Sequence, residues 1–352
     1  MAIKSYKGFD KNLRCRGFQY KIGGIYEMDG KIKMCNRGFH ACESPFDVFD
    51  YYTIIDSRFC EVEQDGNISK WNRGTKICSS KIKIKAELKL ADMFNLGVEW
   101  LKEITSPEKI KTSIKDNSSG NNARIGSSGY GAKIGSSGYD ARIGSSGYDA
   151  RIGSSGYGAQ IGSSGYGAQI GSSGNDARIG SSGNNAKIGS SGYGAQIGSS
   201  GYGAKIGSSG NDAKIGSSGD GAQIGSSGYD AQIGSSGDGA KIGSSGYGAK
   251  ISSSGYGAKI GSSGYGAKIS SSGYGAKIDS TGEDCVIMCA GINSVAKASK
   301  GSWVTLSEWS YSEEKQRYIP ICVKTEFVDG EKIKADTYYS LKGGVFVEWI
   351  ND

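Results

Sequence analysis

The strongest constraint on the fold is a nine-residue repeat that occupies nearly half of the chain. Isoleucine recurs every nine residues from Ile125 to Ile278, giving 18 copies of the pattern Ala-x-Ile-Gly-Ser-Ser-Gly-z-w over residues 121–278, where x, z and w vary. These copies hold 43 of the 59 glycines but no Trp, Phe, Cys, Pro, Met or His. A constant isoleucine at a fixed period is typical of a stacked solenoid, because a flexible linker has no reason to keep one apolar side chain in register.

Each copy predicts one short strand followed by a corner. In Ala-x-Ile the alanine and the isoleucine lie on one side of the strand and x on the other, so we expect Ala and Ile inside and x in water. We expect Gly-Ser-Ser-Gly to form the corner, with glycine supplying a positive φ. The w position is always Gly, Asp or Asn, the residues that tolerate left-handed backbone.

Two copies are expected to make one coil, because nine residues are too few for two strands and two turns. The 18 copies then give a rod of about 43 Å at about 4.8 Å per coil. A triangular coil of three copies, or three chains wound together, is the alternative. A calcium β-roll shares the period but needs a fixed aspartate. Only seven of the 36 z and w positions are Asp, which argues against calcium.

The repeat region is expected to lie between two globular pieces, which contain every Trp, Phe and Cys of the chain. The predicted fold class is mainly β: a parallel β-solenoid over residues 116–289, capped by a small α+β domain over 1–115 and a β-meander domain over 290–352. In the N-terminal domain Ser44-Pro45 is expected to open a short helix, with Asp47 as a capping acid. The other expected elements are strands at 58–64 and 77–90, a helix at 92–104, and C-terminal strands at 302–309, 318–328, 332–341 and 345–350.

The outward x position carries a basic row. It is Lys or Arg in 13 copies and Gln in 5, and the most basic stretch, residues 241–278, contains no acid. Basic side chains with interleaved tyrosines suit a nucleic-acid backbone and its bases. The alternative is a solvated face on which the tyrosines stack on one another. The predicted binding residues are Lys241, Lys250, Lys259, Lys268 and Lys277 with Tyr247, Tyr256, Tyr265 and Tyr274.

The N-terminal piece contains the only histidine, His40, among several cysteines. Cys15, Cys35, His40 and Cys42 could form a Cys₃His zinc site, but Cys35-x4-His40-x-Cys42 lacks the usual C-x2-C pair. Catalysis by a Cys42/His40 pair is a second interpretation, and packing of all four side chains in a core is the third and the favoured one. The chain has no P-loop, no H-E-x-x-H and no nucleophile elbow, so we expect neither a cofactor nor an enzyme.

Several segments of both flanking pieces resemble one family. They are Cys15–Tyr20, Gly24–Glu27, Arg37–Pro45, Asp47–Tyr52 and the tail segment Gly330–Tyr339. They look like uncharacterised bacteriophage and prophage proteins in which a small N-terminal domain with a G-F-H-A-C segment precedes short Gly-rich repeats. The resemblance implies a phage origin and a host-cytoplasm setting, and it implies no activity.

These observations lead to a non-catalytic phage protein whose basic, Tyr-rich solenoid binds nucleic acid or a host nucleoprotein, for example as an anti-defence (anti-CRISPR-like) inhibitor. The alternative is a structural fibre or spacer of a phage particle, made a homo-oligomer by its C-terminal domain. A net charge of +7 is compatible with an anionic partner. With no apolar signal core and no run of about 18 apolar residues, we expect no membrane contact and a cytoplasmic location.

Overall fold

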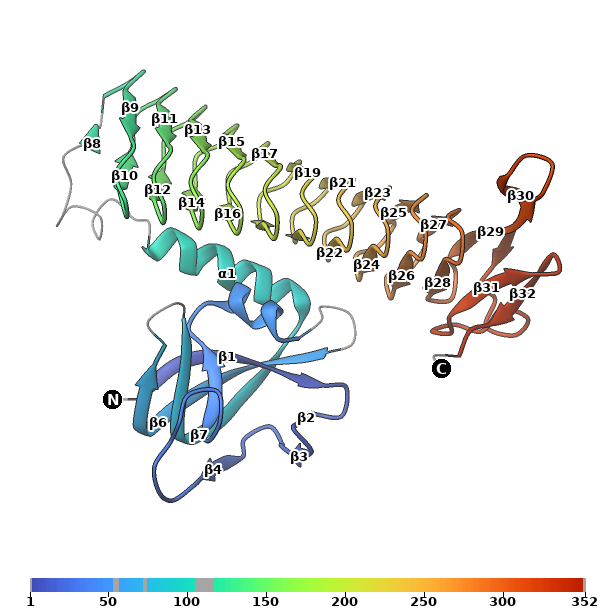
Figure 1. The fold of residues 1–352 in the computed structure, drawn as a ribbon, viewed down its shortest axis with the longest axis horizontal. Helices are drawn as coiled ribbons and strands as arrows, with labels where there is room; N and C mark the ends of the chain where they lie inside the picture. The colour runs from blue at the N-terminus through green and yellow to red at the C-terminus, as the bar shows by residue number, and fades with distance from the viewer. Residues whose placement is uncertain (1, 53–56, 72–74, 105–116, 119, 351–352) are drawn as a thin grey trace. The chain divides into compact units, whose positions relative to one another are not determined.

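The computed structural model describes residues 2–52, 57–71, 75–104, 117–118 and 120–350 (Figure 1). The chain forms two compact units, Met1–Trp100 and Leu101–Asp352. Both units consist mainly of β-strands. The predicted mainly-β fold class is confirmed, although the N-terminal unit, expected to be α+β, is a β-rich domain. In the described part of the chain no helix is long and apolar enough to cross a bilayer.

The N-terminal unit is built on an antiparallel five-stranded sheet in the order β4-β7-β5-β1-β6. Strand β6 also pairs with β7, so β7, β5, β1 and β6 close on themselves into a small barrel. The strands are β1 (Ile3–Asp10), β4 (Ile25–Glu27), β5 (Phe39–Cys42), β6 (Ser57–Lys70) and β7 (Lys76–Leu88), and a separate hairpin joins β2 (Arg14–Cys15) to β3 (Phe18–Gln19). Alternation along β7 buries Ile82 and Ile84 inside the barrel, because successive side chains of a strand point to opposite faces.

Two helices complete this unit. The expected helix after Ser44 is the 3₁₀-helix η1 (Pro45–Asp50), and the expected second helix is α1 (Leu90–Ile104). The capping prediction is wrong: Ser44 makes no side-chain cap, and the Asp47 carboxylate instead accepts a hydrogen bond from the Thr75 hydroxyl at 2.7 Å.

The repeats form a parallel β-solenoid with two copies per coil, as predicted. Each strand pairs in parallel with the strand 18 residues away, so that Ile143 lies beside Ile161. Among the described residues the odd-numbered copies form most of a 12-stranded sheet and the even-numbered copies most of a 13-stranded sheet. The 12-stranded sheet contains β9 (Arg124–Ser127), β11 (Arg142–Ser145), β13 (Gln160–Ser163), β15 (Arg178–Ser181), β17 (Gln196–Ser199), β19 (Lys214–Ser217), β21 (Gln232–Ser235), β23 (Lys250–Ser253), β25 (Lys268–Ser271), β27 (Val286–Cys289), β29 (Trp303–Ser312) and β30 (Arg317–Phe327). The 13-stranded sheet contains β8 (Asn117–Ser118), β10 (Lys133–Ser136), β12 (Arg151–Ser154), β14 (Gln169–Ser172), β16 (Lys187–Ser190), β18 (Lys205–Ser208), β20 (Gln223–Ser226), β22 (Lys241–Ser244), β24 (Lys259–Ser262), β26 (Lys277–Ser280), β28 (Val295–Ala298), β31 (Tyr339–Lys342) and β32 (Val345–Glu348).

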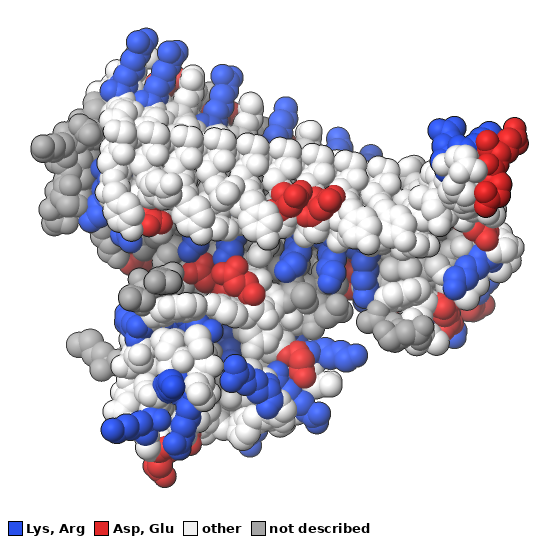
Figure 2. All heavy atoms as spheres, viewed as in Figure 1, with Lys and Arg blue, Asp and Glu red and all other residues white. Residues whose placement is uncertain are grey.

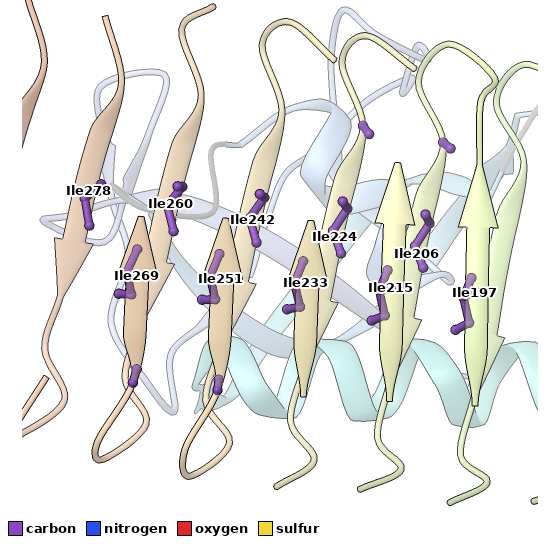
Figure 3. Packing of buried hydrophobic residues seen from close by; sticks show 14 of the residues in the cluster. Ile197, Ile206, Ile215, Ile224, Ile233, Ile242, Ile251, Ile260, Ile269 and Ile278 are labelled. Carbon is purple, nitrogen blue, oxygen red and sulfur yellow. The ribbon is translucent and has the colours of Figure 1, made fainter. Parts of the chain in front are cut away.

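The solenoid core is a double column of isoleucines with alanines between them. Figure 3 shows Ile197, Ile215 and Ile233 on one sheet and Ile206 and Ile224 on the other. Every repeat isoleucine is buried, and the repeat alanines from 141 onward are at most 1% exposed. The inward placement of Ala and Ile is therefore confirmed, and the narrow core explains why a chain with so few large apolar residues still folds.

The predicted corner is displaced by two residues. The first Gly and the first Ser of Gly-Ser-Ser-Gly continue the strand, and the turn is Ser-Gly-z-w-Ala. The positive φ occurs at w, for example 67° at Gly194 and 54° at Asp212. The two glycines of one copy differ: a Cβ on Gly198 would meet no described atom within 4 Å, whereas one on Gly201 would lie 2.1 Å from the Gly183 carbonyl oxygen of the adjacent coil.

The z positions connect neighbouring coils along both edges of the solenoid. Where z is Asn or Asp, its side-chain oxygen accepts a hydrogen bond from the backbone N–H of the z residue one coil on, as Asn175 does from Tyr193 at 3.0 Å. Where Tyr stands at z in two successive coils, rings pack on one another in several pairs; Tyr256 and Tyr274 stack with centroids 5.1 Å apart. The variable residues at z thus reinforce the same stacking that the backbone hydrogen bonds establish.

The C-terminal strands extend both sheets of the solenoid. Strands β27 and β28 form a further coil in register with the repeats, and β29 pairs in parallel with β27. Two antiparallel hairpins follow, β29–β30 on one sheet and β31–β32 on the other, in place of one continuous meander. The strand expected at 332–341 is wrong except for its end, because only Tyr339–Lys342 is a strand.

Candidate functional site

The two-copy coil divides the predicted binding lysines between two faces. Lys250 and Lys268 lie on neighbouring strands of the 12-stranded sheet, whereas Lys241, Lys259 and Lys277 lie on the 13-stranded sheet. The five side chains therefore do not form one surface, because consecutive copies always belong to different sheets.

Lys277 is held by the C-terminal hairpins. Its Nζ lies 4.2 Å from the ring centroid of Tyr338 and 4.9 Å from that of Trp349. Such cation–π contacts stabilise an ammonium group beneath aromatic faces. Lys277 thus fastens the last coil to its cap and is a poor candidate for contact with a large ligand.

The predicted tyrosines form two separate stacks. Tyr247 and Tyr265 lie along one edge with centroids 5.3 Å apart, and Tyr256 and Tyr274 lie along the other at 5.1 Å. Their planes are nearly parallel, at 17° and 6°, so each ring within a stack covers the face of its neighbour. Base stacking needs a free aromatic face, and the ring pairs favour the structural interpretation of these tyrosines.

One face of the solenoid brings together a basic row that consecutive numbering conceals. On the 12-stranded sheet the x side chains of strands β9 to β25 line up in register, and they project along the upper edge of the solenoid in Figure 2. Along this row are the cations Arg124, Arg142, Arg178, Lys214, Lys250 and Lys268 and the neutral side chains Gln160, Gln196 and Gln232. We call these nine residues the basic row.

Cations and glutamines alternate in the middle of the basic row. From Arg142 to Lys250 a cation occurs every 36 residues, with one glutamine between each pair. Parallel strands are about 4.8 Å apart, so these cations are spaced by about 9.6 Å. This distance equals about one Debye length in physiological salt, so the alternation limits the repulsion between neighbouring like charges while the row stays cationic.

An open groove of about 1580 Å³ runs beside the basic row. From β9 to β21 its floor is formed by the glycine two residues after x, such as Gly162 and Gly198, on the outer side of the strand. Ser252 and Ser270 take this position in β23 and β25. Because these residues are small, the long x side chains stand above a flat surface. No acidic residue occurs at the x or first-glycine positions of strands β9 to β25.

The basic row ends in an apolar surface. In the same register as Lys268, the next strands place Val286 and then Trp303 at the x position, and both are about half exposed. On β30, at the edge of the same sheet, Val323 and Phe327 are also exposed. On the 12-stranded sheet the cationic x positions are thus confined to strands β9 to β25.

The sequence predicted cations at the x position, but the predicted binding set grouped consecutive copies and so did not identify which x residues share a face. Arg142, Arg178 and Lys214 were absent from the predicted set, although they face the same side as Lys250 and Lys268. Reading every second copy, which the expected two-copy coil already required, would have found them.

The candidate zinc residues of the N-terminal unit have other partners. Cys15 Sγ lies 3.5 Å from Lys7 Nζ and 3.1 Å from the Tyr52 hydroxyl. His40 Nε2 accepts a hydrogen bond from the Cys35 backbone N–H at 2.9 Å, and Cys42 is buried. In the described part of the chain no three His, Cys, Asp or Glu side chains are grouped so that they could hold a metal ion.

Comparison with known proteins concerns this N-terminal unit. Residues 3–96 match a family described as a domain of unknown function, DUF7666. The N-terminal unit contains a DUF7666 domain. No curated protein and no solved structure was found to match the chain. The resemblance to an uncharacterised family is confirmed for the N-terminal part, while the phage origin and the link with Gly-rich repeats stay predictions.

The DUF7666 domain is expected to lose stability as pH falls from 6.5 to 4. Burial, followed by the charges of Lys76, Lys7 and Arg16, lowers the pKa of His40 to about 4. In the unfolded chain the His40 imidazole has a pKa near 6.5, so the unfolded state takes up the proton at a higher pH than the folded state does. The free energy of unfolding is therefore at its full value above pH 6.5 and falls until about pH 4. We expect a loss of about 2 kcal/mol, less than the full shift implies because His40 is only half buried.

Pulse proteolysis in urea at several pH values, scoring the N-terminal fragment of the full chain, measures this loss. His40→Gln keeps an acceptor for the Cys35 N–H but does not titrate, so its stability should change less over the same interval. An identical pH profile in the variant would show that other groups cause the loss.

Proposed function

We propose that the protein is a non-catalytic binding protein whose basic row contacts the phosphate backbone of nucleic acid. The observation that carries this proposal is the alignment of six Lys and Arg side chains over nine strands of one face, with no acid among them. A solvent-exposed face of a solenoid needs charged side chains for solubility, but solubility does not require that all charges in one row have the same sign. A cationic row beside a flat groove is the arrangement that a polyanion contacts most directly.

The dimensions of the basic row match a short stretch of duplex. Nine strands at about 4.8 Å span about 38 Å, which is the length of roughly eleven base pairs at about 3.4 Å each. The row offers evenly spaced positive charges, which suit the regular phosphates, and the tyrosine faces are stacked on one another. We therefore expect binding through phosphates with little sequence preference and a strong dependence on salt.

The charge of the basic row should set the affinity. Replacing Arg142 and Arg178 by glutamine, the residue that already stands between them at Gln160, should leave the fold intact. Each lost phosphate contact lowers the salt slope by about 0.9 and the affinity by roughly eightfold at 0.1 M salt, so the double variant should bind roughly 60-fold more weakly. Fluorescence anisotropy with a labelled 20-base-pair duplex at several salt concentrations measures both values.

The matched control reverses the change. Gln160→Arg adds one cation to the same row and should strengthen binding and steepen the salt slope. Wild-type protein that does not bind duplex or single-stranded DNA or RNA at low salt would contradict the proposal, as would a double variant with unchanged affinity.

A structural role is the second candidate, and one observation favours it. Strand β30 is the edge strand of its sheet and exposes Ile321, Val323 and Phe327, and exposed apolar edge strands tend to pair with further chains. A chain that fails to bind nucleic acid and that light scattering shows to be oligomeric would fit this role. The finer proposal of a phage-encoded inhibitor of a host nucleoprotein defence effector rests on the family resemblance alone.

A further inference from the structure

A second candidate site lies in the N-terminal unit, in a cleft of about 1170 Å³. The cleft borders strands β1 and β5 and the hairpin β2–β3, and its lining belongs entirely to the DUF7666 domain. Pockets for small molecules usually measure roughly 300–1,000 Å³, so this cleft is large enough for one. The basic row of the solenoid plays no part in it.

A buried ammonium group forms part of the cleft lining. Lys7 on β1 is 5% exposed, and its Nζ donates a hydrogen bond to the His40 carbonyl oxygen at 3.0 Å and contacts Cys15 Sγ at 3.5 Å. Burial lowers the pKa of Lys7. Buried charges in proteins are normally paired with an opposite charge. Among the described residues no carboxylate forms an ion pair with Lys7.

Two more cations of the cleft lack a carboxylate partner in the described residues. Arg16 is presented by the two-residue turn between β2 and β3, where its φ is +50°. Lys76 Nζ lies 4.1 Å from the ring centroid of Tyr51 and 3.7 Å from Cys35 Sγ. Other cations of the same unit, such as Arg58 with Glu87 and Lys85 with Glu63, do form ion pairs. Lys7, Arg16 and Lys76 thus bring to the cleft positive charge that no carboxylate of the described residues pairs with.

The three cations act on one point of the cleft. Lys7 Nζ donates to the His40 carbonyl oxygen, and Lys76 Nζ contacts Cys35, whose backbone N–H donates to His40 Nε2. Burial and then the charges of Lys76, Lys7 and Arg16 lower the pKa of His40, in agreement with this placement. Because the imidazole stays neutral at pH 7, the charge near it comes from Lys7, Arg16 and Lys76, and an anion bound between them would gain from this charge. A phosphate group, with up to two negative charges and several acceptor oxygens, satisfies such a cluster better than a single carboxylate.

The lining of the cleft also contains a group of aromatic side chains. Phe18, Tyr20 and Tyr26 contact one another edge to face with centroids 4.9 to 5.5 Å apart. Phe18 is 51% exposed, which leaves part of this aromatic group open to a ligand. A flat ring would pack on it, as aromatic rings favour such contacts.

We propose that the cleft binds a small phosphorylated aromatic compound of the mononucleotide class, with the phosphate at Lys7, Arg16 and Lys76 and the flat ring against Phe18 and Tyr26. The near-complete burial of Lys7 favours a small molecule, because only the end of a ligand that enters the cleft reaches its Nζ. This arrangement also accounts for the arginine at the left-handed turn position 16, where Asn, Asp or Gly is the usual residue.

Isothermal titration of the full chain with AMP, GMP, CMP and UMP tests the proposal. We expect saturable binding of at least one mononucleotide below about 1 mM, and weaker binding of ribose 5-phosphate and of the corresponding nucleoside, which each lack one half of the ligand. Arg16→Gln, on an exposed turn, should weaken binding about tenfold or more, and Lys7→Met should abolish it. The matched control Lys85→Gln removes a cation of the same unit outside the cleft and should bind as the wild type does.

Three results would overturn the proposal. The first is no saturable binding of any of the four mononucleotides. The second is inorganic phosphate bound as tightly as the mononucleotides, which would remove the aromatic half of the ligand. The third is unchanged binding by Arg16→Gln, a variant that retains the fold whatever Lys7→Met does to stability.

Discussion

Replacing Gly201 by alanine is expected to disrupt the solenoid at that coil, with a loss of about 3–5 kcal/mol of stability. A Cβ at this position would lie 2.1 Å from the Gly183 carbonyl oxygen and 2.5 Å from its carbon. Both are backbone atoms of the adjacent coil, so no side-chain rotation relieves the overlap and the two coils must separate. Urea unfolding followed by circular dichroism should show a lower midpoint or a split transition, because each coil is stabilised only by its neighbours.

Gly198 in the same copy is the matched control. A Cβ there meets no described atom within 4 Å, and the equivalent position is occupied by Ser252, Ser270 and Asp279 in other copies. Gly198→Ala should therefore change stability by no more than about 0.5 kcal/mol. Equal effects of the two substitutions would mean that the close approach at Gly201 is not what makes glycine necessary.

Ile206→Ala is expected to destabilise the solenoid by about 2–5 kcal/mol. Ile206 has no exposed surface and faces the isoleucines of the other sheet (Figure 3). The buried residues around it are the isoleucines, alanines and serines of the repeats, such as Ser208, so no long flexible side chain can move in to fill the cavity. Thermal unfolding of the purified variant, with Ile206→Val expected to cost only about 1 kcal/mol, measures the difference.

Ala296, in the coil formed by β27 and β28, shows how the fold accommodates an alanine in the column of buried isoleucines. Ala296 occupies the position that Ile278 has one coil earlier, and it pairs with Tyr339 of the C-terminal hairpin. Tyr339 and Leu341 belong to the same buried cluster, so the cap supplies the volume that the alanine lacks. An Ile206→Ala variant as stable as the wild type would show that the middle coils can close such a cavity without a cap.

The period of the isoleucines was enough to predict the solenoid. One isoleucine in every nine residues determines where each strand lies, which of its faces is buried and how many residues make one coil. The position of the turn could not be predicted from composition. Both glycines of Gly-Ser-Ser-Gly look like turn residues, yet Gly198 lies in a strand and the left-handed residue is w. Outside the repeats each strand depends on its own partners, and Lys332, for example, forms an ion pair with Glu326 in a turn instead of continuing a strand.

The candidate sites were harder to predict for two different reasons. The basic row depends on which copies share a sheet, and that follows from the coil, as Arg178 and Lys214 illustrate. The cleft of the DUF7666 domain depends on tertiary contacts: Lys7 looks like a surface lysine in an alternating strand, and only the folded barrel buries it beside Cys15. No local pattern marks a residue whose burial comes from segments far away in sequence.

The two-copy coil also restricts how the gene for such a chain can change in length. Gain or loss of 18 residues by recombination between identical copies would lengthen or shorten the rod by one layer of about 4.8 Å, and every x side chain would keep its face. Gain or loss of nine residues would exchange the two faces for all later copies and would bring β29 to the sheet that now ends in β31 and β32. Heritable variation in the length of this rod should therefore occur in steps of two copies.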